Sequence, residues 1–156
     1  MAVFNGSLYV GGEFLVAGGL NSVNLAVWNG STWVAQPAFN NKVRTLAARI
    51  GTTATNSFLF AGGEFTGIGG GGVGVGVNRV ARFSPATNSW SAMGSLDACY
   101  SLMVRATGLN TYEVLAGNVG VSNASVRRWY GTNWITLGNA APGLPRSLTY
   151  HGGSST

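Results

Sequence analysis

Leu8-Tyr9-Val10-Gly11-Gly12-Glu13-Phe14 is the stretch that decides the fold, because it occurs a second time as Leu59-Phe60-Ala61-Gly62-Gly63-Glu64-Phe65. A weaker third copy is Val114-Leu115-Ala116-Gly117-Asn118-Val119. Each copy is followed by an aromatic residue and, five to seven residues later, by a tryptophan. These aromatic pairs are Trp28 with Trp33, Phe83 with Trp90, and Trp129 with Trp134. A unit that recurs in this way predicts a repeat protein, in which neighbouring units bury each other's apolar faces.

The interval that follows each pair is constant. Val43, Tyr100 and Leu144 each stand ten residues after the second aromatic residue of a pair and open a short apolar run. We therefore predict one domain with repeats at about 1–42, 43–98 and 99–143. Residues 144–156 would begin the first strand of a further repeat, and residues 1–6 resemble the end of that same element.

Each repeat is predicted to hold four short strands, and no segment is predicted to be helical. Asn29-Gly30 and Asn5-Gly6-Ser7 supply the positive φ that tight hairpin turns require. Many short strands in a repeating unit predict an all-β propeller. First strands are predicted at 43–50, 98–106 and 144–151, and second strands at 7–12, 57–62 and 111–116. Third strands are predicted at 24–29, 78–84 and 124–130, and fourth strands at 32–36, 89–93 and 133–137.

The recurring residues have structural explanations. A glycine at the end of the second strand has no Cβ, so neighbouring backbone can approach closely. The aromatic pairs, at about 150–250 Å² for each ring, can fill the wedge between one sheet and the next. We expect these positions to anchor the repeats, namely Gly11, Gly12, Trp28, Trp33, Gly62, Gly63, Phe83, Trp90, Gly117, Trp129 and Trp134.

An apolar strand that ends in Gly-Gly and is followed by an aromatic residue and a tryptophan resembles the kelch repeat. Tyr9-Val10-Gly11-Gly12-Glu13-Phe14, with Ala17-Gly18-Gly19 after it, is also similar to repeats of large secreted bacterial proteins and fungal cell-surface proteins. The resemblance covers the whole chain. It implies a kelch-like β-propeller, like the central domain of galactose oxidase, with about three four-stranded blades in this chain.

Kelch-like propellers have six or seven blades, so the resemblance implies that three blades are half or a fragment of a ring. We expect either the rest of a longer propeller chain or self-association to complete it. Two chains would close a six-bladed ring if strand 144–151 of one paired with strand 7–12 of the other. The third repeat departs most from the pattern, because Ala116-Gly117-Asn118 stands in the place of Gly-Gly-Glu.

Composition narrows the class of partner. The formal net charge is +5, but the cations are scattered along the chain, and only 8% of residues are charged. A nucleic-acid interface needs basic residues concentrated on one face, so we expect no nucleic-acid partner. No apolar run approaches the roughly 18 residues of a membrane span. A surface of hydroxyls, amides and glycine favours an extracellular or cell-surface location and disfavours an intracellular kelch adaptor.

Glu13 and Glu64 occupy equivalent repeat positions, as does Asn118 in our alignment of the third copy. They could form a ring of acceptors for a cation or a sugar. Recurrence at one position of the repeat favours structural ion pairs instead, for example between Glu64 and Arg82. Two carboxylates of a glycosidase must lie roughly 5–10 Å apart, which equivalent residues of different repeats need not satisfy.

The sequence predicts no metal site, cofactor or catalytic residue. His151 is the only histidine, so multi-histidine metal sites and serine–histidine triads lack their parts. Cys99 beside Tyr100 resembles part of the ligand set of kelch-like copper oxidases, but a buried strand cysteine is the favoured interpretation.

The glycine run 67–76 has no helix after it, so we reject a phosphate loop and expect a surface loop or a ribbon that orders on a partner. Asn5, Asn29 and Asn123 begin glycosylation sequons, two of them at predicted hairpin turns.

The residues therefore favour a non-enzymatic extracellular module for binding, adhesion or structural assembly through the loops of its blades. The alternative is a carbohydrate-binding or carbohydrate-active propeller, in which a glycan stacks on exposed aromatic residues beside asparagine and arginine donors. Tyr112, Tyr130 and Phe39 are the aromatic residues proposed for that role.

Overall fold

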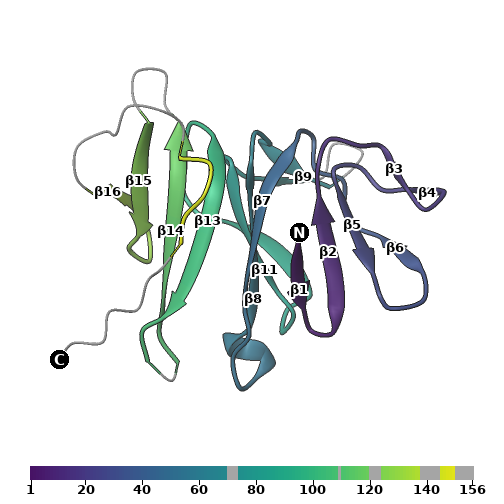
Figure 1. The fold of residues 1–156 in the computed structure, drawn as a ribbon, viewed down its shortest axis with the longest axis horizontal. Helices are drawn as coiled ribbons and strands as arrows, with labels where there is room; N and C mark the ends of the chain where they lie inside the picture. Colours follow the sequence, from purple (N-terminus) through teal and green to yellow (C-terminus); the bar gives the residue numbers. More distant parts are fainter. Residues whose placement is uncertain (70–73, 109, 120–123, 138–144, 150–156) are drawn as a thin grey trace.

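The computed structural model describes residues 1–69, 74–108, 110–119, 124–137 and 145–149. The fold is all-β, as predicted: three four-stranded antiparallel sheets and two two-stranded ribbons (Figure 1). Within the described ranges the helical content is one 3₁₀ turn, η1 (Ala54–Asn56).

Each large sheet is built from strands in chain order, the first strand at one edge and the fourth at the other. Sheet one contains β1 (Ala2–Phe4), β2 (Ser7–Gly11), β5 (Leu25–Trp28) and β6 (Trp33–Ala35). Sheet two contains β7 (Val43–Arg49), β8 (Phe58–Gly63), β11 (Val80–Ser84) and β12 (Ser89–Ala92). Sheet three contains β13 (Cys99–Ala106), β14 (Tyr112–Val119), β15 (Ala124–Trp129) and β16 (Trp134–Thr136). Apart from the strand predicted at 144–151, the predicted strands are confirmed to within a few residues.

Two asparagine–glycine turns close hairpins in different ways. Asn5 and Gly6 have φ values of 49° and 77°, the two positive angles of a tight two-residue turn between β1 and β2. At the second turn only Gly30 has positive φ. There the Asn29 side chain accepts hydrogen bonds from the backbone N–H groups of Ser31 and Thr32, so the turn spans four residues.

A β-bulge corrects the predicted alignment of the repeats. Val43 pairs with Gly63, and Cys99 pairs with Asn118, with a register shift directly after each. Cys99, and not Tyr100, is therefore the counterpart of Val43. Asn118 takes the place of Gly63, so its predicted equivalence to Glu13 and Glu64 is wrong.

In the sequence, one ribbon comes between the second and third strands of sheet one, and the other comes between the second and third strands of sheet two. They are formed by β3 (Val16–Ala17) with β4 (Leu20–Asn21), and by β9 (Gly67–Ile68) with β10 (Val75–Gly76). The glycine run thus forms a ribbon within this chain, and Ile68 is buried against the core. Residues 70–73 of the run lie outside the described residues.

Successive residues of a strand point to opposite faces of a sheet. We call the face that carries the aromatic pair the aromatic face, and the other the back face. Leu59, Ala61 and Trp90 of the aromatic face of sheet two share a core with Phe4 and Leu25 of the back face of sheet one. In the same way, Val114, Ala116 and Trp134 of sheet three pack with Phe60 and Val80 of sheet two. Sheets two and three therefore each bury their aromatic face on the back face of the sheet before them.

The first strands gather along the middle of the stack. β7 contacts both β1 and β13, whereas β6 and β16 lie at opposite sides of the molecule (Figure 1). A glycine in each second strand allows this approach. A Cβ at Gly11 would collide with Val43, one at Gly62 with Cys99, and one at Gly117 with Pro145. The structural role predicted for these three glycines agrees with this packing.

Residues 145–149 form no strand in this chain, unlike the prediction for 144–151, whose other residues lie outside the described ranges. The segment nevertheless lies on sheet three, where the Ser101 hydroxyl donates a hydrogen bond to the Pro145 carbonyl at 2.6 Å. The edge of β2 over Ser7–Tyr9 is already paired with β1. The predicted pairing of strand 144–151 with the whole of 7–12 is therefore excluded.

Candidate functional site

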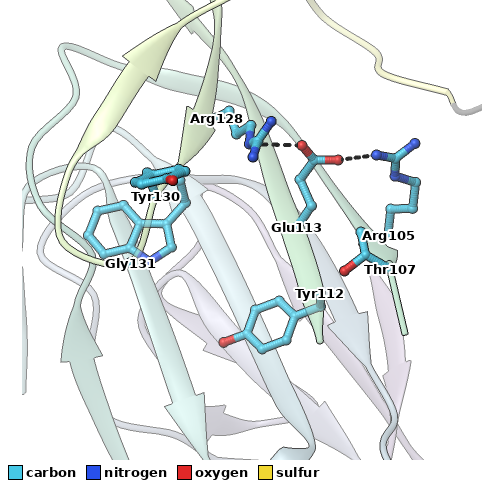
Figure 2. Close-up of a pocket in the computed structure, with 8 residues that line it drawn as sticks. Arg105, Thr107, Tyr112, Glu113, Arg128, Tyr130 and Gly131 are labelled. Carbon is cyan, nitrogen blue, oxygen red and sulfur yellow. Dashed lines mark hydrogen bonds and ion pairs between the residues drawn. The ribbon is translucent and has the colours of Figure 1, made fainter. Parts of the chain in front are cut away.

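One hollow lies at one end of sheet three and has a volume of about 460 Å³. It is formed where β13 ends, β14 begins and β15 ends (Figure 2). Its lining residues are Arg105, Thr107, Tyr112, Glu113, Arg128, Trp129, Tyr130 and Gly131. The sequence predicted two of these, Tyr112 and Tyr130, as glycan-stacking residues.

Glu113 is held between two arginines on the back face of sheet three (Figure 2). Its carboxylate accepts from Arg105 Nη2 at 2.6 Å and from Arg128 Nε at 3.0 Å, and its side chain is only 12% exposed. Because both carboxylate oxygens are engaged, Glu113 fixes the two guanidinium groups at the rim. One carboxylate and two guanidinium groups leave this cluster with a net positive charge.

Tyr130 provides an exposed aromatic surface beside these charges. Its side chain is 66% exposed. The Arg128 guanidinium carbon lies 5.7 Å from the centre of the Tyr130 ring, within the range of a cation–π contact. A flat polar ligand could stack on this ring while an arginine donates to it.

Tyr112 is half-buried, so only part of it lines the hollow. Its ring packs against Phe58 and Phe60 at centroid distances of 5.6 and 5.8 Å. The Arg49 guanidinium lies 5.1 Å from the same ring, and Arg82 Nη1 donates to the hydroxyl at 3.4 Å. Tyr112 thus joins sheet three to sheet two, and its prediction as an exposed aromatic residue is wrong in this respect.

Phe39 is also not available to a ligand. It is completely buried and meets Phe65 and Trp90 edge to face, with ring centres 4.7 and 5.1 Å apart. Its prediction as an exposed stacking residue is wrong because it fills the core between sheets one and two.

Glu13 and Glu64 are held in separate ion pairs. Glu13 meets Lys42 Nζ at 2.8 Å. Glu64 meets Arg44 Nη2 at 2.7 Å, so the predicted partner Arg82 is wrong. The hydrogen bond to Glu64 raises the pKa of Arg44 above its ordinary value. These contacts favour the structural interpretation of both carboxylates over a ring of acceptors.

Asn118 differs from the two glutamates in position and surroundings. It is buried, and its side-chain oxygen accepts a hydrogen bond from the Asp97 backbone N–H at 3.0 Å. Asn118 therefore stabilises the loop that leads into sheet three.

Cys99 is completely buried between sheets two and three. Burial raises the pKa of its thiol to about 12, so it is not a reactive thiolate near neutral pH. Over the described ranges no three His, Cys, Asp or Glu side chains are grouped so that they could hold a metal ion. His151 and Asn123 lie outside the described residues.

The sequence interpretation missed Arg105, Glu113 and Arg128. Counting outward from the predicted turn near residue 110 would have placed Arg105 opposite Glu113, as the observed register does. Arg128 would not have been found in this way, since it comes from the next strand and pairs with Leu115.

Comparisons of the chain with known protein families, with curated proteins and with solved structures gave no significant match. The described part of the structure contains no helix with the length and apolar character needed to span a membrane.

Proposed function

We propose that the chain is a non-enzymatic, extracellular module of the kelch-like β-propeller type. Its three four-stranded sheets would be the blades, with repeats at about 1–42, 43–98 and 99–143. Its role would be binding, adhesion or structural assembly through the loops at the ends of the blades. The repeated stacking of aromatic face on back face supports this architecture, because propeller blades bury their faces against each other in the same order.

The observation that carries the binding role is apolar exposure on the two ribbons. Leu15, Val16 and Leu20 on or beside the β3–β4 ribbon are 69%, 57% and 42% exposed. Val75 on the β9–β10 ribbon is 43% exposed. Both ribbons follow the second strand of a sheet, so they project from the same end of the stack (Figure 1). Clustered exposed apolar residues of this kind mark interaction surfaces.

The experiment compares the chain with a Leu15→Ser, Val16→Ser, Leu20→Ser variant. Beads coated with the chain should cluster with each other or attach to cell-wall fragments, and the variant should lose most of this attachment. Ile50→Ser is the matched control, because Ile50 is 67% exposed but lies at the opposite end of sheet two. Equal attachment by chain and ribbon variant would refute a binding role for the ribbons.

A carbohydrate ligand is the second candidate function, supported by Tyr130 and Arg128 in the hollow of sheet three. Glu113 is the single carboxylate among the residues that line it, and both of its oxygens are occupied by arginine. A glycosidase uses two carboxylates across one bond, so the geometry favours binding over hydrolysis. The positive cluster favours an acidic sugar.

Affinity electrophoresis in gels that contain an acidic polysaccharide, such as polygalacturonate, tests this second function. The chain should be retarded, and Tyr130→Ala should weaken retention about tenfold, in line with the loss of one stacking contact. Tyr130→Phe keeps the ring and should retain most of the affinity. If Tyr130→Ala is retarded as strongly as the unaltered chain, the hollow is not the glycan site.

A further inference from the structure

The two outermost faces of the stack carry the same positions as the two internal interfaces. On the aromatic face of sheet one, Leu8, Val10, Trp28 and Trp33 correspond to residues that are buried or packed against a neighbouring sheet in sheets two and three. No described residue places another four-stranded sheet against this face. Val3, which pairs with Leu8 on this face, is 63% exposed. The face has the composition of a buried interface.

The back face of sheet three carries the positions that form the other side of the internal interfaces. Leu115 takes the place of Phe60 in sheet two and of Tyr9 in sheet one, each of which packs against a neighbouring core. Met103 pairs with Leu115 on the same face. Both side chains remain partly exposed, while Phe60 is completely buried.

Residues 145–149 mark where a further sheet would lie. Pro145 contacts Gly117 as Cys99 contacts Gly62 and as Val43 contacts Gly11. Val43 and Cys99 each begin the first strand of the sheet that follows. Leu148 stands three residues after Pro145, just as the buried residues Leu46 and Leu102 stand three residues after Val43 and Cys99. The segment therefore occupies the place of the beginning of a first strand.

Sheet one has a gap that matches this segment. β1 pairs only with Ser7–Tyr9, so Val10 and Gly11 have no partner strand on that edge within the described residues. Their counterparts in β8, Ala61 and Gly62, pair with Leu46 and Thr45 of a complete first strand. β1 of sheet one therefore corresponds to the second half of a complete first strand such as β7. Residues 145–148 correspond to the first half.

We propose that a second copy of this chain joins these surfaces head to tail. Residues 145–148 of one copy would pair with Val10 and Gly11 of the other, and the aromatic face of sheet one would pack on the back face of sheet three. Two such contacts close a ring of six sheets, which removes the exposed edge of β2. This inference rests on the propeller architecture of the proposed function, but not on its binding role.

A second copy is favoured because this chain's own internal interfaces already show that the two kinds of face fit each other. The charged cluster at Glu113 is compatible with the contact. In the internal interface between sheets two and three, Tyr112 stands two residues before Val114. The corresponding residue of sheet one, two residues before Leu8, is Gly6, so no side chain would enter the hollow from that position.

Sedimentation equilibrium of the full chain tests the ring. The expected mass is that of two copies of the 16.1 kDa chain at concentrations well above micromolar. Val3→Lys on the aromatic face and Met103→Lys on the back face should each raise the dissociation constant about tenfold or more. Ile50→Lys is the control of similar exposure on neither outer face and should leave the mass at two copies. Tryptophan fluorescence should show that all variants remain folded.

Mixing the variants tests the head-to-tail arrangement. A pair of one Val3→Lys chain and one Met103→Lys chain retains one unaltered contact, so association should recover in the mixture. A monomeric unaltered chain, or a dimer that neither substitution weakens, would overturn the proposal. So would a dimer that Val3→Lys disrupts and Met103→Lys does not, because that pattern means like faces meet.

The ribbon and ring experiments fail independently. Gly18 of the β3–β4 ribbon lies against Trp33 of the aromatic face. The ribbon variant used in the bead assay leaves Trp33, Leu8 and Val10 unaltered, so it should keep the mass of two copies. A ring that persists without bead attachment overturns the binding role alone. Attachment by a monomeric chain overturns the ring alone.

Discussion

One glycine in the second strand of each sheet lies against the first residue of the segment that follows. At Gly62 an added Cβ would come within 2.5 Å of Cys99 Sγ and 2.8 Å of Thr45 Cγ2, and Cys99 is completely buried. At Gly76 it would meet nothing within 4 Å. Substituting these two glycines therefore separates the cost of crowding a packed neighbour from the effect of replacing a glycine by alanine as such.

We predict that Gly62→Ala destabilises the chain by about 1–3 kcal/mol, the usual cost of overpacking a filled interior. Gly76→Ala should change the unfolding free energy by less than about 0.5 kcal/mol, as surface substitutions do. Urea unfolding followed by tryptophan fluorescence measures both. Equal effects would mean that close approach between sheets is not why residue 62 is a glycine.

Cys99 should make stability depend on pH in the alkaline range. Its thiol has a pKa of about 12 when buried, against 9.0 ordinarily. Between these values the unfolded chain releases a proton that the folded chain keeps, so the unfolding free energy falls as the pH rises. The slope should be roughly 1 kcal/mol per pH unit between these values, and the effect should fade as the pH falls below 9.

Cys99→Ala removes this contribution and keeps those of the tyrosines, including Tyr9, whose pKa burial also raises. The difference between the pH slopes of the two proteins above pH 9 therefore isolates the thiol. Identical slopes would show that the thiol ionises as readily in the folded chain as in the unfolded one.

At the scale of elements, two tryptophans in equivalent fourth strands differ in one hydrogen bond. Trp134 Nε1 donates at 2.5 Å to the carbonyl of Met93, the residue directly after β12 of sheet two. Trp90 Nε1 is buried without a hydrogen-bond partner among the described residues. Both side chains are buried to a similar extent, so the pair isolates the value of the bond between sheets.

We predict that Trp134→Phe costs about 1–2 kcal/mol more than Trp90→Phe, because it leaves a buried carbonyl without its donor. The loss of ring volume is the same in both variants and cancels in the comparison. Urea denaturation of the two variants measures the difference. A larger cost for Trp90→Phe would show that water or another group satisfies its indole in solution.

The bulge that follows both Val43 and Cys99 identifies these two residues as counterparts and shows that alignment by spacing was off by one residue in the third repeat. Counting ten residues from each second aromatic residue gave Tyr100 as the counterpart of Val43. The loop between sheets two and three is one residue shorter by this measure, since Cys99 follows Trp90 by nine positions and Val43 follows Trp33 by ten. Only the pairing of strands reveals this, because hydrogen bonds and not loop lengths define the register.

At the scale of the whole molecule, the stack ends in two unlike faces, one aromatic and one mixed. Ring closure by a second copy would bury the aromatic face of sheet one against the back face of sheet three. Each sheet would then have a neighbouring sheet on both faces, as sheet two has. The apolar ribbons and the hollow lie at opposite ends of the sheets, since the ribbons follow second strands and the hollow adjoins the start of one. The ribbons and the hollow are therefore separate surfaces, and Glu113 with its two arginines lies on the back face of sheet three that ring closure would cover.

The amino-acid sequence by itself determined the local structure: the alternation of apolar residues, the glycine at the end of each second strand and the paired aromatic residues predicted where the strands lie and why those side chains recur. These features depend on residues close in sequence, so periodicity and turn chemistry are sufficient. The tertiary structure alone decided what each side chain meets. Phe39 became core, Glu64 paired with Arg44, and Arg128 reached Glu113 from another strand. Such contacts join distant segments, and they follow from how strands pair and sheets stack, which local sequence does not encode.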